Sequence, residues 1–245
     1  MLDQLKPLQQ IANRPIVAYF ILALLQIKVV WRIWDYKDLA TGDTSSYFLT
    51  AYSWYKYFVS DIVWSPLYTS FYGTFLNIFS DVYAATILHR LVIVFTATLL
   101  ILAVLRRLLP PTIAWMIAAW WAILPINFDT LYEVHLFAII PSLAACLLIL
   151  SNSAPWARGG AIGIMVATTV LVRNELSLAT VAIGCICIAW EVWQYRSDER
   201  KLPIRTYLLS YGLPILVLFA SFCSSMPIQE LSFQNYLLIQ RQNIP

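Results

Sequence analysis

The sequence has 245 residues, of which 60% are hydrophobic and 12% are charged, and its mean hydropathy is +0.71. Soluble domains use about 45–50% apolar and about 25% charged residues, so this composition excludes an ordinary soluble globular protein. The net charge of +3 comes from Lys and Arg spread along the chain. Such a spread is typical of membrane topology signals, and we therefore exclude a nucleic-acid partner.

Seven apolar runs approach the length of about 20 residues that a helix needs to cross about 30 Å of hydrocarbon. In chain order they are 16–34, 85–105, 112–126, 131–150, 159–172, 176–193 and 206–223. The first run lacks a small-residue cleavage site, so we interpret it as a retained helix rather than a signal peptide. The sequence predicts an all-α protein, a polytopic membrane helix bundle of about seven transmembrane helices, with 1–245 as a single transmembrane domain.

The segment 35–84 between the first two runs is too long for a tight turn. Within it, Tyr47, Ala51, Trp54 and Phe58 recur at helical spacing and form one apolar face. A helix with such a face lies on the membrane surface, and 67–79 is a second interfacial piece. Asp43 precedes the first of these helices as a plausible cap. We therefore expect a first external loop with amphipathic interfacial helices.

The distribution of Lys and Arg predicts the orientation of the helices. With the N-terminus in the cytoplasm, the loops 1–15, 106–111, 151–158 and 194–205 lie inside and carry basic residues. Most acids then lie outside: Asp35, Asp38, Asp43, Asp61, Asp81, Asp129 and Glu230, with Glu133 and Glu175 near the outer helix ends. We expect a multi-pass protein of the plasma or inner membrane whose active face is extracytoplasmic.

The first cluster that can carry chemistry surrounds Asp35 and Asp43, directly after the first apolar run. A carboxylate fixed where a loop enters an interfacial helix can act as a general base toward an acceptor hydroxyl, or can hold a divalent cation. The alternative is structural, with Asp43 only a helix cap and Asp35 solvated.

Three further groups lie on the same predicted side. Asp129 and Glu133 are four residues apart, which places them on one helix face if the helix begins before Asp129, while His135 projects elsewhere. This carboxylate pair either coordinates a metal, serves a structural salt bridge or lies in a hydrated loop. Arg173 offers a planar fork suited to phosphate, with Glu175 beside it. The alternative here is an Arg–Glu pair within a tight turn.

His89 and Arg90 begin the second apolar run at its outer end. They are a further candidate contact for phosphate, and the alternative is that they reach the membrane interface as amphipathic side chains. The four cysteines lie in apolar runs, and Cys185 and Cys187 fall on different faces of one helix, so neither a disulfide framework nor a zinc site is predicted.

Four stretches occur in one order on one side: GDTSSYF (42–48), WSPLY (64–68), YEVHLF (132–137) and VRNEL (172–176). This layout resembles the GT-C superfamily of membrane glycosyltransferases, in particular its family 39-like members, over residues 16–180. The last stretch is similar to an Arg-Pro-Glu pattern of the superfamily, with Asn174 in place of the proline. Members usually have more helices and often a soluble external domain, whereas this sequence stops at Pro245, so the resemblance implies a truncated or a reduced member.

The resemblance implies transfer of a sugar from a polyprenyl-phosphate-linked donor to an acceptor at the extracytoplasmic face. Its catalytic position falls on Asp43, with Asp35 as the rival, and a divalent metal ion would be held by Asp43 and Asp129. The substrate-binding residues that it implies are Arg173, Glu175, Arg90, His89, Glu133, His135, Tyr47 and Tyr68. Its partners would be the lipid-linked sugar, membrane lipids, and a glycan, lipid or protein acceptor.

Two other classes of function stay open from the sequence. A transporter or flippase of a lipid-linked glycan needs polar residues along several helices at mid-membrane depth, and the runs 112–126, 159–172 and 176–193 have no charge at their centres. A non-catalytic membrane subunit would not need the outer acids. No Walker A loop, His-Glu-x-x-His or Gly-x-Ser-x-Gly motif is present in the sequence.

Overall fold

The computed structural model describes residues 14–31, 43–59, 64–128, 133–151, 153–172 and 177–197, and the single residues 209, 212 and 216. These residues form eight α-helices and one short 3-10 helix, and no strand occurs among them, which confirms the all-α expectation for this part of the chain. The elements are α2 (Pro15–Val30), α3 (Asp43–Tyr57), α4 (Pro66–Ile78), α5 (Val82–Leu108), α6 (Pro111–Ala122), η3 (Pro125–Asn127), α7 (Glu133–Ile149), α8 (Pro155–Val172) and α9 (Ser177–Ser197).

Local sequence explains where these helices begin. Proline has no amide hydrogen and a fixed φ, so it suits the first turn of a helix, where that amide would have no partner. Asp81 caps α5, because its side chain accepts a hydrogen bond of 3.0 Å from the backbone amide of Tyr83. Four helices start at proline residues: Pro15, Pro66, Pro111 and Pro155.

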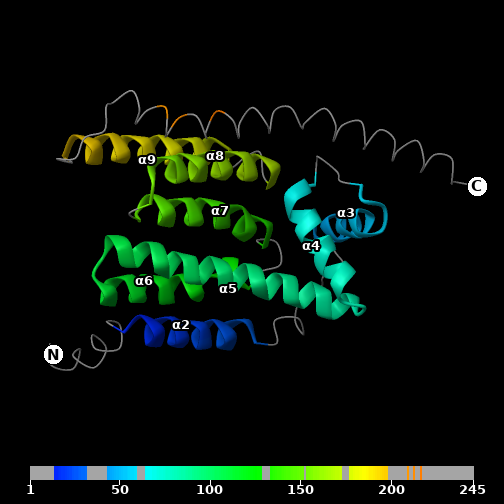
Figure 1. The fold of residues 1–245 in the computed structure, drawn as a ribbon. Helices are drawn as coiled ribbons and strands as arrows, with labels where there is room; N and C mark the ends of the chain where they lie inside the picture. Colours follow the sequence, from blue (N-terminus) through cyan, green and yellow to red (C-terminus); the bar gives the residue numbers. More distant parts are fainter. Residues whose placement is uncertain are drawn as a thin grey trace, which may run out of the picture.

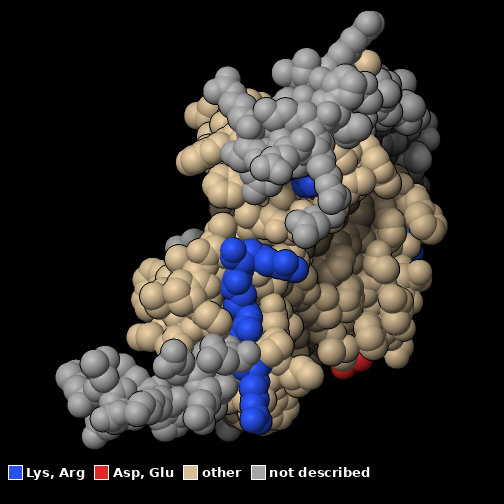
Figure 2. Space-filling view, turned by 60° about the vertical axis from the view of Figure 1, so that its left-hand side comes forward, with Lys and Arg blue, Asp and Glu red and all other residues tan. Residues whose placement is uncertain are grey.

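Six helices form a bundle with alternating directions, and α3 and α4 lie together at one end of it (Figure 1). The short connection from α5 to α6 and the one from α7 to α8 both lie at the other end. Arg14, Arg106 and Arg158 belong to helix ends on that side, and Figure 2 shows Lys and Arg side chains in a band there. Asp43 and Glu133 begin helices at the end that carries α3 and α4.

The separation of charge is incomplete, because Lys28 lies in the last turn of α2 and Glu191 of α9 pairs with Arg158. The orientation in a membrane stays a prediction. By length and composition, α5 is the one described helix long and apolar enough to cross a membrane. Three described segments are apolar but shorter: Pro15–Val30, Glu133–Ile149 and Leu178–Trp193.

Small residues let α6 approach its neighbours closely. Ala114, Ala118 and Ala122 recur every four residues, are fully buried, and pack with Leu22 of α2 and Leu102 of α5. Such a stripe of small side chains permits backbones to pack at short range in apolar surroundings. The α6 stripe is therefore the seam that joins α6 to α2 and α5.

Two polar contacts join the same three helices, α2, α5 and α6. The Thr98 hydroxyl of α5 donates a 2.8 Å hydrogen bond to Oε1 of Gln26 on α2, and both residues are buried. The Trp115 indole of α6 donates to the Ala18 carbonyl of α2 at 3.1 Å. Because no water competes in an apolar interior, these bonds fix the register of the three helices.

α3 packs against α4 through a close backbone approach. A Cβ placed on Gly73 of α4 would lie 2.6 Å from the Ala51 carbonyl oxygen and 2.8 Å from the Trp54 ring of α3. Glycine is therefore the residue that permits this contact. Helices occur at both predicted places, because 47–58 lies almost wholly within α3 and 67–79 almost wholly within α4. Their position at a membrane surface stays a prediction.

The predicted apolar face of α3 is right at three of its four positions. Tyr47 and Ala51 are buried and Trp54 is half-buried. The prediction is wrong for Phe58, because α3 ends at Tyr57. Phe58 has a φ of 55°, and 76% of its surface is exposed. A left-handed residue after the last turn terminates a helix, so the side chain leaves the helical face.

α7 runs along α5 and α8 and contains Pro141 in its interior. Proline cannot donate the amide hydrogen bond that would reach the carbonyl of Phe137, four residues earlier. The part of α7 before Pro141 carries Glu133 and Phe137, and the part after it carries Ala145 and Ile149. The two parts of α7 thus belong to different packing environments, one beside α4 and one beside α8 and α9.

Candidate functional site

A buried ion pair joins α5 to α7 at the end of the bundle that carries α3 and α4. The Arg90 Nε lies 2.6 Å from the Glu133 Oε2, and the two side chains are 8% and 6% exposed. Each charge would be costly to bury alone, so the partners stabilise one another inside the bundle. Within the described residues, Nη2 of Arg90 is buried and has no hydrogen-bond partner.

Tyr68 of α4 contacts His89 beside this pair. Its hydroxyl lies 3.1 Å from Nε2 of His89. The phenol donates to the Nδ1–H tautomer of His89 and accepts from the Nε2–H tautomer. Desolvation by burial and the nearby Glu133 charge raise the pKa of Tyr68 well above its ordinary value, so the phenol stays protonated.

A second tyrosine of α4 holds the other face of the imidazole. The Tyr72 ring stacks on the His89 ring at a centroid distance of 3.8 Å and an interplanar angle of 12°. The Tyr72 hydroxyl and the Thr86 Oγ1 are 2.5 Å apart. Burial raises the pKa of Tyr72 to about 12. The imidazole is therefore fixed by α4 on two sides.

α3 contributes aromatic contacts and one carboxylate. The Tyr47 ring meets Tyr68 and Trp64 edge-on, with centroid distances of 5.4 Å to each. Asp43 lies four residues before Tyr47, in the first turn of α3, and is exposed. Residues four apart share a helix face, so Asp43 lies about one turn from the ring that covers Tyr68.

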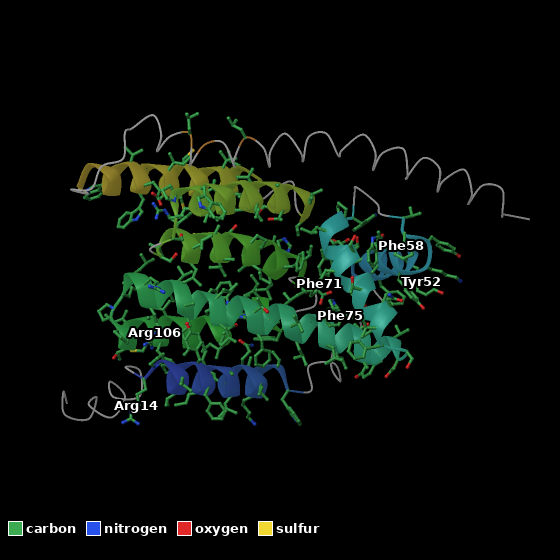
Figure 3. All side chains as sticks on the ribbon, viewed as in Figure 1. Arg14, Tyr52, Phe58, Phe71, Phe75 and Arg106 are labelled. Atoms are coloured by element: carbon green, nitrogen blue, oxygen red, sulfur yellow. The ribbon has the colours of Figure 1, made fainter. Side chains whose placement is uncertain are left out.

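Apolar rings enclose the polar cluster. Phe137 of α7 packs edge-on against Tyr68 at 5.7 Å and lies 5.0 Å from Phe71 of α4. Figure 3 shows Phe71 and Phe75 on α4, with Tyr52 and Phe58 further out near α3, all at the end opposite Arg14 and Arg106. A low-dielectric shell of this kind strengthens the electrostatic interactions inside it.

The structure thus brings together five of the sequence-predicted site residues. Tyr47, Tyr68, His89, Arg90 and Glu133 meet from α3, α4, α5 and α7. Glu133 forms a salt bridge with Arg90, which agrees with the structural alternative given above, although the sequence did not name the partner. Arg90 and His89 are both buried, so the alternative that they reach toward the membrane interface is wrong.

The remaining predicted residues divide into two groups. His135 is half-buried and lies two positions after Glu133, on a different face of α7, as the spacing predicts. Asp35, Asp129, Arg173 and Glu175 lie outside the described residues.

No group of three or more His, Cys, Asp or Glu side chains that could hold a metal ion occurs among the described residues. Because Asp129 lies outside them, the metal role of Asp43 and Asp129 stays a prediction.

Sequence reasoning missed Tyr72 and Thr86. Tyr72 is one helical turn after Tyr68, and Thr86 is three residues before His89, so both share faces with predicted residues. Helical spacing from Tyr68 and His89 was the signal that could have found them.

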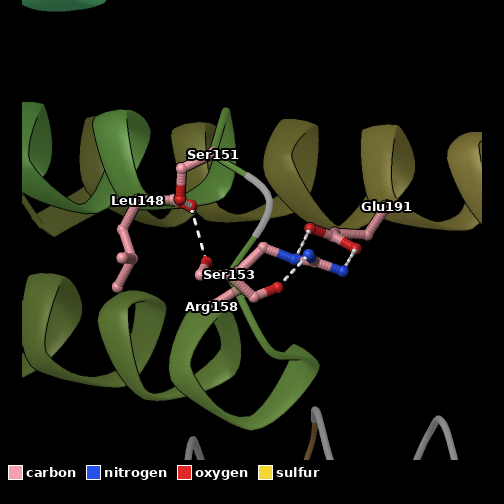
Figure 4. A network of polar contacts seen from close by, with 5 residues as sticks. All are labelled: Leu148, Ser151, Ser153, Arg158 and Glu191. Atoms are coloured by element: carbon pink, nitrogen blue, oxygen red, sulfur yellow. Dashed lines mark hydrogen bonds and ion pairs between the residues drawn. The ribbon is translucent and has the colours of Figure 1, made fainter.

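A second ion pair at the opposite end was also missed. Arg158 of α8 binds Glu191 of α9 through two contacts: its Nε lies 2.6 Å from Oε1 and its Nη2 donates to Oε2 at 3.0 Å (Figure 4). Arg158 also donates to the Ser153 carbonyl. A lone acid within an apolar run was the available signal, because an ionisable group there requires a partner.

A scan against models of known protein families finds no match, and neither do searches of curated proteins and of solved structures.

Proposed function

We propose that this chain is a polytopic membrane glycosyltransferase of the GT-C type, which moves a sugar from a polyprenyl-phosphate-linked donor to an acceptor at the extracytoplasmic face. One observation carries the proposal. Three helices, α4, α5 and α7, gather Tyr68, His89, Arg90 and Glu133 at the end of the bundle where Asp43 begins α3.

The outer surface of the described helices supports the membrane assignment. Large apolar side chains are exposed along α2, α6 and α9, whereas the charged residues discussed above lie toward helix ends. Exposed apolar surface of this extent marks contact with lipid or with another protein. The most exposed members are Ile16, Phe20 and Trp31 on α2, Met116 and Trp120 on α6, and Leu178, Ile186 and Trp193 on α9.

The number of spans and their orientation belong to the proposal. Six described helices, α2 and α5 to α9, overlap six of the seven apolar runs proposed as spans, and α5 is the one described helix that meets the length and composition of a span. The seventh run, 206–223, lies almost wholly outside the described residues. Placing Arg14, Arg106 and Arg158 in the cytoplasm follows the positive-inside rule. The end with α3 and α4 is then extracytoplasmic.

In the proposed reaction, Asp43 takes the proton of an acceptor hydroxyl while that oxygen bonds to the anomeric carbon of the donor. The bond from this carbon to the lipid phosphate breaks, and the phosphate keeps the electron pair. An exposed carboxylate in the first helical turn can reach such an acceptor. Arg173 and Glu175 would bind the donor headgroup, Asp35 is the alternative base, and Asp129 would share a cation with Asp43.

Arg90 fits a role beside the departing phosphate. Its Nε is neutralised by Glu133, and its Nη2 is a buried donor without a partner in the described part of the chain. Leaving such a donor unsatisfied costs about 1–3 kcal/mol, so an incoming oxygen acceptor would be favoured there. Negative charge develops on the leaving phosphate in the transition state, where a fixed donor stabilises it.

The experiment compares Asp43→Asn with Asp81→Asn in the full chain, reconstituted in lipid vesicles. Both aspartates stand at the same end of the bundle, and Asp81 serves as the cap of α5. Transfer is measured from a panel of radiolabelled polyprenyl-phosphate hexoses and pentoses to membrane extracts. We expect Asp43→Asn to lower the rate by about 10²–10⁴-fold, the range for loss of a general base. Asp81→Asn should leave the rate of the folded protein unchanged.

Full transfer activity in Asp43→Asn would exclude Asp43 as the base. Absence of transfer from every donor by the unaltered, folded chain would contradict the enzyme assignment and would favour a non-catalytic subunit.

A further inference from the structure

Two thiols from different helices meet where α7, α8 and α9 pack together. Cys187 of α9 is buried, and Cys146 of α7 is half-buried against the same apolar cluster. The two side chains therefore share one packed apolar cluster. The other members of this cluster are Ala145, Ile149, Ala161, Ile162 and Met165, with Val166 and Ile183 at its edge.

The rotation of α9 about its axis determines which of its cysteines enters the cluster. Ile183, Cys187 and Glu191 recur every four residues, so they lie on one face of the helix. Glu191 binds Arg158 of α8 through two contacts, which fixes the rotation of α9 (Figure 4). Cys185, two residues before Cys187, is exposed on another face. The same helix therefore carries one thiol inside the cluster that Cys146 contacts and one exposed thiol that serves as a control.

We propose that Cys146 and Cys187 are a redox-modifiable pair, which forms a disulfide between α7 and α9 when an uncharged two-electron oxidant enters the bundle. A quinone dissolved in the bilayer is the class of oxidant that the apolar surroundings of the pair admit. Each thiol loses one proton and one electron, the S–S bond forms, and the quinone takes up both protons and both electrons to become the quinol. The inference does not depend on the proposed transferase activity.

The bond would act on a specific set of helices. α7 and α9 flank α8, so a covalent link between them closes a loop that contains α8. Closing a loop lowers the entropy of the unfolded chain, so the oxidised protein should unfold at a higher temperature. A disulfide requires β-carbons about 3.5–4.5 Å apart, so the proposal requires the two side chains to approach one another within the cluster that they share.

The experiment uses the full chain in detergent and diamide, an uncharged azo compound that accepts two electrons and two protons to become its hydrazine. Remaining thiols are then blocked with a maleimide under denaturing conditions, and peptides are identified by mass spectrometry. We expect one dominant product, a peptide pair linked through Cys146 and Cys187, with the loss of two maleimide labels and full reversal by dithiothreitol.

Two sets of variants make the result specific. In Cys185→Ala/Cys223→Ala the native pair remains, and the same crosslink and the same rise in unfolding temperature are expected. In Cys146→Ala/Cys223→Ala the remaining thiols are Cys185 and Cys187, and no intramolecular crosslink is expected from the folded protein. Diamide applied to the unaltered chain unfolded in denaturant should give mixed pairings, which shows that the fold selects the pair.

Retention of all labels after diamide treatment of the native chain would overturn the proposal. A dominant native crosslink through Cys185 would overturn it as well, because that outcome requires a different facing of α9.

Discussion

Glu133 and Arg90 are 43 positions apart in the sequence, yet their Oε2 and Nε atoms lie 2.6 Å from one another inside the bundle. The pair joins α7 to α5, and the Tyr68 hydroxyl of α4 contacts His89, the neighbour of Arg90 in α5. Three helices therefore meet around one buried carboxylate.

Replacing Glu133 with Gln should destabilise the protein by about 3–5 kcal/mol, because Gln leaves the Arg90 charge buried without a counter-ion. The double variant Arg90→Met/Glu133→Leu should recover most of this loss, since apolar side chains remove both charges together. The measurement is the thermal unfolding midpoint in detergent. A double variant no more stable than the single one would show that the charge imbalance is not the cause.

The second ion pair provides a control of position. Glu191→Gln should lower the unfolding midpoint through the same imbalance at Arg158, although that pair is less buried on the arginine side. Because α8 and α9 carry it at the end opposite α3, transfer activity per folded molecule should be unaffected. A selective loss of activity in Glu191→Gln would argue against a site at the α3 end.

Gly73→Ala should separate α3 from α4. The added Cβ would lie 2.6 Å from a backbone oxygen of α3, so the helices must move apart, with an expected loss of about 1–3 kcal/mol. Gly184→Ala is the matched control, because its nearest neighbours would be 3.7 Å away, at ordinary contact distance. Limited proteolysis within α3 reports the separation. Equal protease resistance in both variants would contradict the close approach.

Stability should fall in alkaline solution because of Tyr72. Its pKa is about 12 in the folded protein and 10.0 in the unfolded reference, so the unfolded chain loses the proton first as pH rises. The associated stability is fully present below pH 10 and decreases by about 2–3 kcal/mol as pH rises toward 12. Tyr72→Phe should flatten this part of the profile, whereas Tyr55→Phe, at an exposed phenol, should leave it unchanged.

The hydrogen bond between Thr98 and Gln26 offers a test of packing at depth. Thr98→Val keeps the shape of the side chain but removes the hydroxyl, so Oε1 of Gln26 loses its donor. Interhelical hydrogen bonds in membranes contribute on average about 0.6 kcal/mol, up to about 1.7 kcal/mol, and a loss in this range is expected from the unfolding midpoint. Thr168→Val, at a hydroxyl that bonds the Ile164 carbonyl of its own helix, should cost less.

The helices were predictable because their signals are local. Apolar length located the long helices of the bundle, and prolines marked several starts, although the predicted 159–172 begins four residues after α8 does. The four-residue periodicity after Asp43 located α3, and it failed only at Phe58, where a left-handed backbone ends the helix. A single reversed φ has little signature in sequence.

The partners within the candidate site were not predictable in the same way. The sequence left Glu133 either a metal ligand or a member of a structural salt bridge, and it did not identify the partner Arg90, which comes from α5. Such a pairing depends on which helices are neighbours and how each is rotated, and apolar periodicity leaves both open in helices that are hydrophobic on every side. The two tyrosines of α4 fix His89 for the same reason, through tertiary contacts alone.

Pro141 has a mechanical consequence for these contacts. With one rung missing from its hydrogen-bond ladder, α7 can bend at that point at lower energy than an unbroken helix. The half that holds Glu133 can then shift by small amounts while the half beside α8 and α9 stays seated. Small movements of the Glu133 half of α7 would then leave the packing against α8 and α9 unchanged.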